Sequence, residues 1–540
     1  MPFLSSLPII LPLLGAAGTL ALSRVGRMRR YAHLVALGAA ALATLSLLPP
    51  LWAASRPVVT SLWQPSLLFG STPVLQAEPV TATLALVFAV AVAAALLVET
   101  GRGAEMSASL AATTLALLAP AVAVLWSANV LTLIVSWAAF DLLAATVRFA
   151  AGAPGRAVVR GLALGQLATL LVWGGALLAE GDGALTRLWP LMGATRAQLT
   201  FWALAGVIRL ALYPVHLSLP DELRAGQAGS VPLLVQPLLG WGLWLRIVAV
   251  NGGLMPPFAW LPLCGAITVA LGGFLAWARE SPHRLVPWAG MTANGALLVA
   301  STLVGPRAPD LILAGGTAWA LATLTLALAP GYERWRWWWS VPALVGAFAL
   351  LGLPLTIGFA AQAVLLGSLV RGARLGPALC LFVGQVFLLP ALARSLLAAP
   401  LRPQPGGFWS RAAHGIGTGA PAAWLVLAGL APRAAFGATQ AFSLAESFAA
   451  PTLAGWLLWI VCLALGALLV WQEHNLRPRL SFLLTAVHDL LRLEWLYNAL
   501  MGAVDRGLSI LRVADEIVGG VGALLWSWVL FLAMLLVVGS

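Results

Sequence analysis

The stretch LALYPVHLSLPDELRAGQAGSVP, residues 210–232, overlaps the end of one apolar segment, 198–216, and the start of the next, 231–250. It is rich in residues that end or bend a helix: Pro214, Pro220, Gly226, Gly229 and Pro232. A proline lacks the N–H that a helix uses and clashes with the preceding turn. The stretch therefore predicts an interrupted helix.

A second interruption is predicted in the apolar segment 340–370, which carries GLPLTIGF at 352–359 near its middle. Pro354 removes a helical hydrogen bond, and Gly352 and Gly358 loosen the neighbouring turns. Interrupted helices in corresponding positions of two halves indicate inverted repeats with an ion site near the middle of the membrane. A packing kink gives a similar local pattern, so the signal favours transport and leaves simple packing open.

The composition is that of a membrane protein. Hydrophobic residues make up 61% of the 540 residues and charged residues 9%, with a mean hydropathy of +0.95, whereas soluble domains carry about 25% charged residues. About 20 apolar residues span the bilayer core as a helix that pairs its own backbone groups. The sequence therefore predicts an all-α, polytopic membrane protein of about sixteen transmembrane helices. They are expected near 3–22, 31–51, 79–98, 107–125, 128–149, 157–179, 198–216, 231–250, 257–278, 285–304, 309–329, 340–370, 377–399, 418–436, 455–472 and 520–538.

The net charge of +12 arises from thirty arginines, and the chain contains no lysine. If the N-terminus is outside, the arginine clusters fall mostly in cytoplasmic loops, as the positive-inside rule requires. The excess charge then suits anionic lipid rather than nucleic acid. We therefore expect a multi-pass protein of a prokaryotic inner (cytoplasmic) membrane. An arginine, with a pKa above about 12, holds a charge in place and does not release a proton as a buried lysine can.

The C-terminal region changes character at about residue 473. Between 473 and 516, charged residues alternate with Leu, Trp and Val, and an apolar segment follows at 520–538. This pattern predicts a lateral amphipathic helix along the cytoplasmic membrane surface, tied down by a terminal anchor. A helix that reaches sideways implies neighbouring subunits.

Four strings together resemble the antiporter-like membrane subunits of respiratory complex I, which are shared with Mrp cation/proton antiporters and membrane-bound hydrogenases. They are LTLIVSWAAFDLL (131–143), IRLALYPVHLSLPD (208–221), SPHRLVPWAGMTANG (281–295) and GLPLTIGFAAQA (352–363). The layout is most similar to the large complex I member, with its sixteen helices and lateral helix. The resemblance implies N-terminal helices at 1–106, repeats at 107–251 and 257–399, C-terminal helices at 400–472, a lateral helix at 473–519 and an anchor at 520–540.

This chain departs from the family at the residues that form the family's polar axis. In place of the family's glutamate, three lysines and histidine it has Ala138, Arg209, Ala320, Gln362 and Gln236. Asp141 lies three residues after Ala138 and hence on nearly the same helix face. The row of titratable groups is interrupted.

Asp141 and Arg209 are the strongest candidates for an ion path. A lone charge at the bilayer centre costs about 2.5–3.5 kcal/mol on insertion scales, so a partner is expected, and an Asp–Arg pair can be bidentate. The pair is either a remnant of the family's ion-path pair or an ion pair that locks two helices together.

Other polar residues fall near the predicted breaks. His216 titrates in the physiological range or caps the break, while Gln236 and Gln362 can support a water wire without carrying charge. Arg148, Arg246, His283 and Arg284 are expected at the membrane interfaces by snorkelling. Cys264, Cys380 and Cys462 lie singly, and no haem, metal or phosphate-binding motif is found, so we expect no cofactor.

Three functions remain open at this stage. The first is an antiporter-like subunit of an NADH-quinone oxidoreductase, hydrogenase or Mrp-type assembly that contributes to proton or cation translocation, with the redox chemistry in its partners. The second is a non-pumping scaffold whose lateral helix clamps neighbouring subunits. The third is a stand-alone ion or solute transporter.

Overall fold

The computed structural model describes residues 2–52, 54, 57–59, 72–102, 107–178, 189, 193–219, 228–281, 284–329, 337–372, 374–398, 407–436, 442–519, 527–530 and 534. Within these ranges the regular elements are helices, apart from one antiparallel pair of two-residue strands, β1 (Val58–Val59) and β2 (Val74–Leu75). The predicted all-α class is confirmed.

Eleven helices within the described ranges are long and apolar enough to cross a membrane, and two shorter apolar helices accompany them, Trp338–Leu350 and Gly358–Arg371. The chain is therefore a multi-pass membrane protein, as its composition predicted. The count of about sixteen helices stays a prediction.

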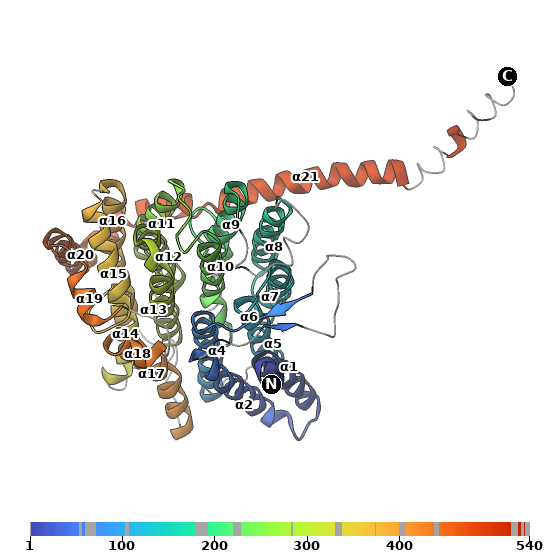
Figure 1. Ribbon diagram of the computed structural model, residues 1–540, viewed down its shortest axis with the longest axis horizontal. Helices are drawn as coiled ribbons and strands as arrows, with labels where there is room; N and C mark the ends of the chain where they lie inside the picture. The colour runs from blue at the N-terminus through green and yellow to red at the C-terminus, as the bar shows by residue number, and fades with distance from the viewer. Residues whose placement is uncertain are drawn as a thin grey trace. The chain divides into compact units, whose positions relative to one another are not determined.

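The first half of the chain surrounds the first predicted break. Its helices are α1 (Pro2–Arg24), η1 (Arg29–Tyr31), α2 (Ala32–Ser46), η2 (Pro49–Leu51), α4 (Pro79–Gly101), α5 (Ala108–Ala116), α6 (Leu118–Leu125), α7 (Val130–Ala150), α8 (Gly155–Leu177), α9 (Arg196–Arg209), η4 (His216–Ser218), η5 (Ala228–Val235) and α10 (Pro237–Val250). α8 packs between α7 and α9 (Figure 1).

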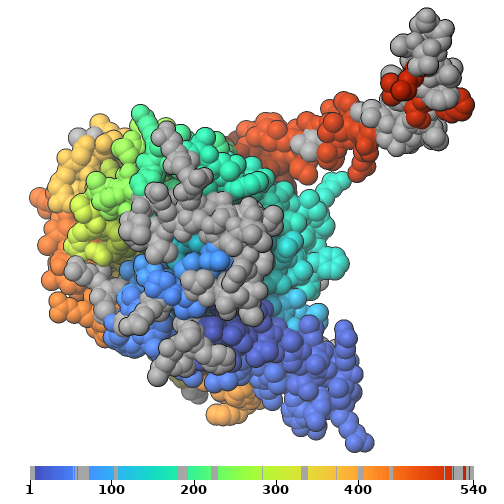
Figure 2. All heavy atoms as spheres, turned by 45° about the vertical axis from the view of Figure 1, so that its right-hand side comes forward, coloured from blue at the N-terminus to red at the C-terminus, as the bar shows by residue number. Residues whose placement is uncertain are grey.

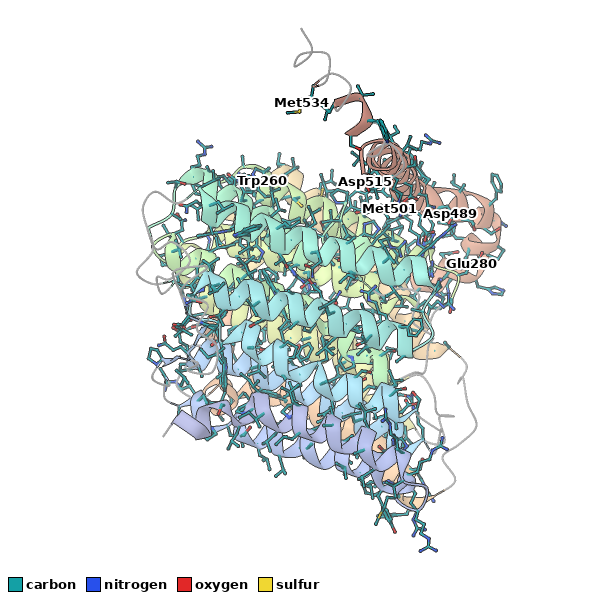
Figure 3. All side chains as sticks on the ribbon, turned by 90° about the vertical axis from the view of Figure 1, so that its right-hand side faces the viewer. Trp260, Glu280, Asp489, Met501, Asp515 and Met534 are labelled. Carbon is teal, nitrogen blue, oxygen red and sulfur yellow. The ribbon has the colours of Figure 1, made fainter. Side chains whose placement is uncertain are left out.

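The second half surrounds the second predicted break. Its helices are α11 (Trp260–Ala278), α12 (Val286–Leu303), η7 (Gly305–Arg307), α13 (Ala308–Leu328), η8 (Trp337–Ser340), α14 (Val341–Leu350), α15 (Gly358–Arg371), α16 (Leu375–Leu397), α17 (Phe408–Leu430), α18 (Pro432–Phe436) and α19 (Leu444–Ala449). α11 packs on both α12 and α16, and Gly273 meets Gly384 backbone to backbone because neither has a Cβ. Trp260 and Glu280, at the two ends of α11, lie on opposite sides of the bundle (Figure 3).

One of the most buried helices in the described part of the chain is α13, at the centre of the bundle. An apolar stretch of 18 residues that includes most of α13 is 94% buried, whereas the corresponding stretches at α1 and α2 are each 28% buried. Those two N-terminal helices lie at an edge of the molecule, in dark blue in Figure 2. Their exposed leucines and alanines are suited to contact with lipid.

Both predicted helix interruptions are present, and they share one backbone geometry. α9 ends at Arg209 and is followed by Ala211 with φ +54°, while α14 ends at Leu350 and is followed by Gly352 with φ +64°. Each end has the two backbone hydrogen bonds of a Schellman motif: Ala211 to Ile208, Leu212 to Val207, Gly352 to Ala349 and Leu353 to Phe348. Among the residues predicted to break the helices, Pro214, Gly352, Pro354 and Gly358 lie at these ends, whereas Pro220 is outside the described residues.

Two helices differ from the sequence expectation. α17 begins at Phe408 rather than near 418, because its first turns pack against the rest of the bundle and bury His414. α20 (Leu453–Leu491) continues past residue 473, and the next helix, α21 (Glu494–Gly519), begins after Leu493, whose φ is +59°.

The chain forms two compact units, Met1–Arg477 and Pro478–Ser540. Within the second unit, α21 exposes large apolar side chains at helical spacing, among them Leu500, Leu508 and Leu511. Asp489, Met501 and Asp515 mark this unit in Figure 3. An apolar stripe on a charged helix is what an amphipathic surface helix requires.

Candidate functional site

Asp141 and Arg209 form a bidentate ion pair inside the first half of the bundle. Arg209 Nη1 donates to Asp141 Oδ1 at 2.6 Å, and Nη2 donates to Oδ2 at 2.9 Å. The side chains are 6% and 9% exposed, respectively. The two residues come from α7 and from the last turn of α9, so the pair joins two helices that are separated in sequence by α8.

Backbone geometry holds the pair in position. Gly165 on α8 lies directly over the carboxylate, and a Cβ there would come within 2.7 Å of the Asp141 oxygens. The Arg209 guanidinium lies 4.3 Å from the centre of the Trp137 ring, which is a cation–π contact. A glycine on one side and a tryptophan on the other leave the charges little room to move.

Neighbouring polar groups add hydrogen bonds to the pair. Arg209 Nη2 also donates to the Gly165 carbonyl at 2.9 Å and to Thr169 Oγ1 at 2.8 Å. Gln166 Nε2 donates to Asp141 Oδ2 at 3.2 Å. A buried ion pair needs partners for its remaining donors and acceptors. The α8 helix supplies three of them, whereas Arg209 Nε has no hydrogen-bond partner among the described residues.

A cavity of about 30 Å³ adjoins the pair. Asp141, Arg209, Gln236 and Ser218 line it, together with Gly165 and nearby apolar residues. Gln236 Nε2 donates to the Ser218 carbonyl at 2.9 Å. The volume and the polar lining suit about one water molecule. Three of the predicted ion-path residues, Asp141, Arg209 and Gln236, therefore meet at one cavity.

His216, another predicted ion-path residue, lies beside the break but does not line this cavity. Its ring is 2% exposed, stacks on Tyr213 and packs against Trp288, with centroids 5.2 Å apart in both cases. Its Nδ1 lies 3.2 Å from the Pro214 carbonyl oxygen. This environment is that of a packed residue that stabilises the break.

The remaining candidate, Gln362, belongs to a second and separate cavity of about 40 Å³ in the other half. Gln385 and Trp319 also line it, and both glutamines are buried. Gly352 touches the Gln362 side chain so closely that a Cβ would overlap it. Neutral amides line this cavity, whereas a charged pair lines the first cavity.

The sequence analysis missed several residues that line the two cavities or contact the Asp141–Arg209 pair. They are Trp137, Gly165, Gln166, Thr169, Ser218 and Gln385. A usable signal was present on α8, where Gly165, Gln166 and Thr169 fall within one helical turn of an otherwise apolar segment. No such signal marks Ser218, which contributes its backbone carbonyl.

Two arginines expected at the membrane interface are buried instead. Arg148 Nη2 donates to the Ser218 carbonyl, and Arg246 donates to the carbonyls of Ser127, Gly242 and Leu125. Unpaired carbonyls at helix ends and bends attract a buried guanidinium, so snorkelling was the wrong expectation for both. Arg284 is exposed, and His283 lies outside the described residues.

A second charged cluster lies at the C-terminal end of α11. Arg394 on α16 and Arg477 on α20 both pair with Glu473, at 3.1 and 3.3 Å. The two arginines also donate to the last carbonyls of α11, those of Ala276, Trp277, Ala278 and Arg279. The cluster fixes the beginning of the charged C-terminal region to α11 and α16.

Within the described ranges, no group of three His, Cys, Asp or Glu side chains is placed to hold a metal ion. The chemistry available in the two cavities is that of one fixed positive charge, one carboxylate and several neutral hydrogen-bonding groups.

Comparisons with known proteins agree with this architecture. No family model matches the chain. It is 27% identical over 347 residues to NADH-quinone oxidoreductase subunit N of Mycobacterium sp. (strain JLS), covering 58% of this chain and 73% of that protein.

Two solved structures are similar along nearly the whole chain. A chain of the Mrp complex from Dietzia sp. DQ12-45-1b matches with a TM-score of 0.73 and 19% identity, over 99% of this chain and 63% of that one. A chain of the membrane-bound sulfane sulfur reductase, an archaeal respiratory membrane complex, matches with a TM-score of 0.71 and 18% identity, over 99% and 100%. This chain thus spans less than two thirds of the Mrp chain.

The interrupted helices and the buried polar cavities define a membrane protein with the antiporter-like fold. The predicted resemblance to the antiporter-like membrane subunits of complex I, Mrp antiporters and membrane-bound hydrogenases is confirmed.

Proposed function

We propose that this chain is an antiporter-like membrane subunit of a complex I-related assembly, of the NADH-quinone oxidoreductase, hydrogenase or Mrp type, and that it contributes to proton or cation translocation through a modified polar axis. Partner subunits would carry the redox chemistry. The observation that carries the proposal is the buried Asp141–Arg209 pair at a polar cavity that also contains Gln236.

The chemistry of the pair defines the role of each member. The guanidinium group of Arg209 acts as a fixed positive charge. Any proton that passes through the pair has to bind the Asp141 carboxylate, with Gln236 and a water at the cavity as neutral relays. A cation would be attracted to Asp141 and repelled by Arg209, so movement of one side chain away from the other would change the affinity for the ion.

The scaffold function is the second candidate, and two observations favour it. The pair makes several hydrogen bonds and is closely packed, as a helix-locking ion pair would be. The second cavity holds the neutral Gln362 and Gln385 where the family has a lysine. In this case the lateral helix would clamp neighbouring subunits, and the Arg394–Glu473–Arg477 cluster would anchor it.

The membrane topology belongs to the same proposal. We infer a prokaryotic inner membrane, an outside N-terminus and a cytoplasmic position for the lateral helix. The support is the distribution of arginines among the loops and the amphipathic character of α21.

Copurification from native membranes tests the assembly. The tagged full chain should bring down other membrane subunits, and recovery of the chain alone would favour a stand-alone transporter. A truncation after Arg477 removes the second unit and leaves the Arg394–Glu473–Arg477 cluster intact. It should weaken recovery of the partners more than membrane insertion of this chain, and unchanged recovery would contradict the clamp.

Ion transport by the assembled complex separates the translocator from the scaffold. The ratio of ions moved to electrons transferred should fall in the double variant Asp141→Asn/Arg209→Gln if the pair belongs to the ion path. An unchanged ratio would assign the pair to structure alone. Arg196→Gln, at an exposed position at the start of α9, serves as the control for loss of one arginine.

A further inference from the structure

A large open cavity lies away from both polar cavities, where α12 and α15 end and where α13 begins. Its volume is about 500 Å³, and its charged lining consists of Arg307, Arg371, Arg374 and Glu446. The other cavities described above are far smaller, at about 30 and 40 Å³. This one is large enough for a chemical group of several heavy atoms.

Arg307 is already held by its neighbours. It lies 3.6 Å from Asp310 and 3.4 Å from Glu446, and its guanidinium stacks on the Phe442 ring at 3.9 Å. The two carboxylates offset its charge and orient it at the cavity wall. Arg307 therefore contributes shape and one fixed guanidinium rather than an uncompensated charge.

Arg371 and Arg374 are different. Both are exposed at the end of α15 and line the cavity, and neither side chain has an ion pair or hydrogen bond with another described residue. Two guanidinium groups that line one cavity and form no ion pair with a described carboxylate attract an anion. Guanidinium groups are matched in geometry to phosphate oxygens, which they bind through paired hydrogen bonds.

Apart from Ser368 and Gly372, the rest of the cavity wall is apolar. Leu303, Val304, Val364 and Ala450 line it together with Phe442. A site for a small soluble anion needs no such wall, whereas an anionic lipid presents a phosphate beside a hydrocarbon chain. The charged and the apolar parts of the cavity match the two parts of a phospholipid.

The orientation expected from the sequence adds an independent argument. It places Arg307, Arg371 and Arg374 on the outer side of the membrane, where the positive-inside rule does not account for arginine. A local anionic ligand would account for Arg371 and Arg374, because the carboxylates of Asp310 and Glu446 already offset the charge of Arg307.

We propose that this cavity is a binding site for an anionic phospholipid, in which Arg371 and Arg374 bind the phosphodiester and the Leu303, Val304 and Val364 side receives the start of an acyl chain. The site is separate from the Asp141–Arg209 cavity and does not depend on ion transport by that pair.

Lipid binding to the purified full chain in detergent tests the proposal. The probes are phosphatidylglycerol, phosphatidylcholine with the same acyl chains, and glycerol 3-phosphate, and the readout is the number of lipids retained and the apparent Kd by native mass spectrometry. Arg371→Gln/Arg374→Gln should bind phosphatidylglycerol about tenfold more weakly than the unmodified chain, because it loses two charge-assisted contacts. The lysine variant, Arg371→Lys/Arg374→Lys, should have an intermediate affinity, because both charges remain but the paired hydrogen bonds of the guanidinium groups are lost.

The control variant is Arg196→Gln/Arg433→Gln, which removes two exposed arginines that do not line the cavity. It should bind phosphatidylglycerol like the unmodified chain, and phosphatidylcholine should bind weakly to all variants. Equal phosphatidylglycerol binding by the glutamine variant and the control would overturn the proposal. Competition by glycerol 3-phosphate as strong as that of the whole lipid would replace the lipid with a small anion. If Arg371→Gln/Arg374→Gln lost copurifying subunits but kept its lipid, the cavity would instead bind an acidic surface of a partner subunit.

Discussion

The interruption after α9 and the interruption after α14 have the same backbone geometry, but the first lies beside a charged pair and the second beside neutral amides. Each helix ends in a Schellman motif with one residue of positive φ, Ala211 or Gly352. Arg209 precedes its break and pairs with Asp141, whereas Gln362 follows its break and shares a neutral cavity with Gln385. The break therefore does not depend on a charge beside it.

The comparison separates what the fold needs from what ion transport needs. Backbone hydrogen bonds and close packing produce the break, and both halves keep them. Buried charges add a desolvation cost that only a well-formed ion pair offsets. The Asp141–Arg209 pair in the first half is such an ion pair. Substitutions of the cavity residues should consequently lower the folding stability more in the first half than in the second.

The largest effect is expected from Asp141→Asn. The variant leaves the Arg209 charge buried without its counter-ion, which typically costs about 3–5 kcal/mol of folding free energy. Asp141→Asn/Arg209→Gln should recover much of this loss, because it removes both charges. Titration of the purified chain in detergent with a denaturant measures the free energy of unfolding of both variants. A double variant as unstable as the single one would mean that the pair is not the source of the cost.

Gly165→Ala should have the next largest effect. The new Cβ would lie about 2.7 Å from the Asp141 carboxylate, and such overpacking typically costs about 1–3 kcal/mol. Gly174→Ala on the same helix is the matched control, because its Cβ would meet only the Phe201 ring at 3.4 Å. The same unfolding experiment compares the two variants. Equal stability would contradict the claim that packing against Gly165 holds the Asp141 carboxylate in place.

The sequence was sufficient to predict the helical class, the two interruptions and the Asp141–Arg209 pair. Prolines and glycines mark the breaks, and two charges in apolar helices need each other. The residue of positive φ in the first break could not be predicted, because Ala211 is an alanine and alanine disfavours that conformation.

Other features depend on tertiary contacts that no local pattern contains. Arg148 and Arg246 bind backbone carbonyls that only the folded chain brings to them. α17 begins earlier than its hydropathy indicated, because packing buries His414 and Thr418 in its first turns. Gln385 lines the same cavity as Gln362 but comes from a different helix, and sequence spacing does not predict that the two residues meet there.

Arg209→Lys should have a smaller effect on stability than loss of the carboxylate, about 1–2 kcal/mol. The charge remains, but a lysine cannot reproduce a bidentate pair together with the bonds to Gly165 and Thr169. The same variant sharpens the functional comparison, because a lysine can give up its proton. A rise in the ion-to-electron ratio of the assembled complex would indicate that arginine blocks a proton relay at this position. If the ratio does not change, the arginine at this position is not what limits proton movement along the path.

The smallest effect is expected from Gln362→Leu in the second half. The substitution removes a neutral amide, leaves no charge behind and nearly conserves volume, so it should cost less than about 1.5 kcal/mol. The same unfolding experiment measures it next to Asp141→Asn. A loss of about 3 kcal/mol or more would mean that Gln362 and Gln385 belong to a strongly coupled polar network. In that case the neutral cavity would be as essential to the fold as the charged one, and the contrast between the two halves would not hold. A small loss, together with an unchanged ion-to-electron ratio, would identify the second half as the part of the polar axis that no longer carries ions.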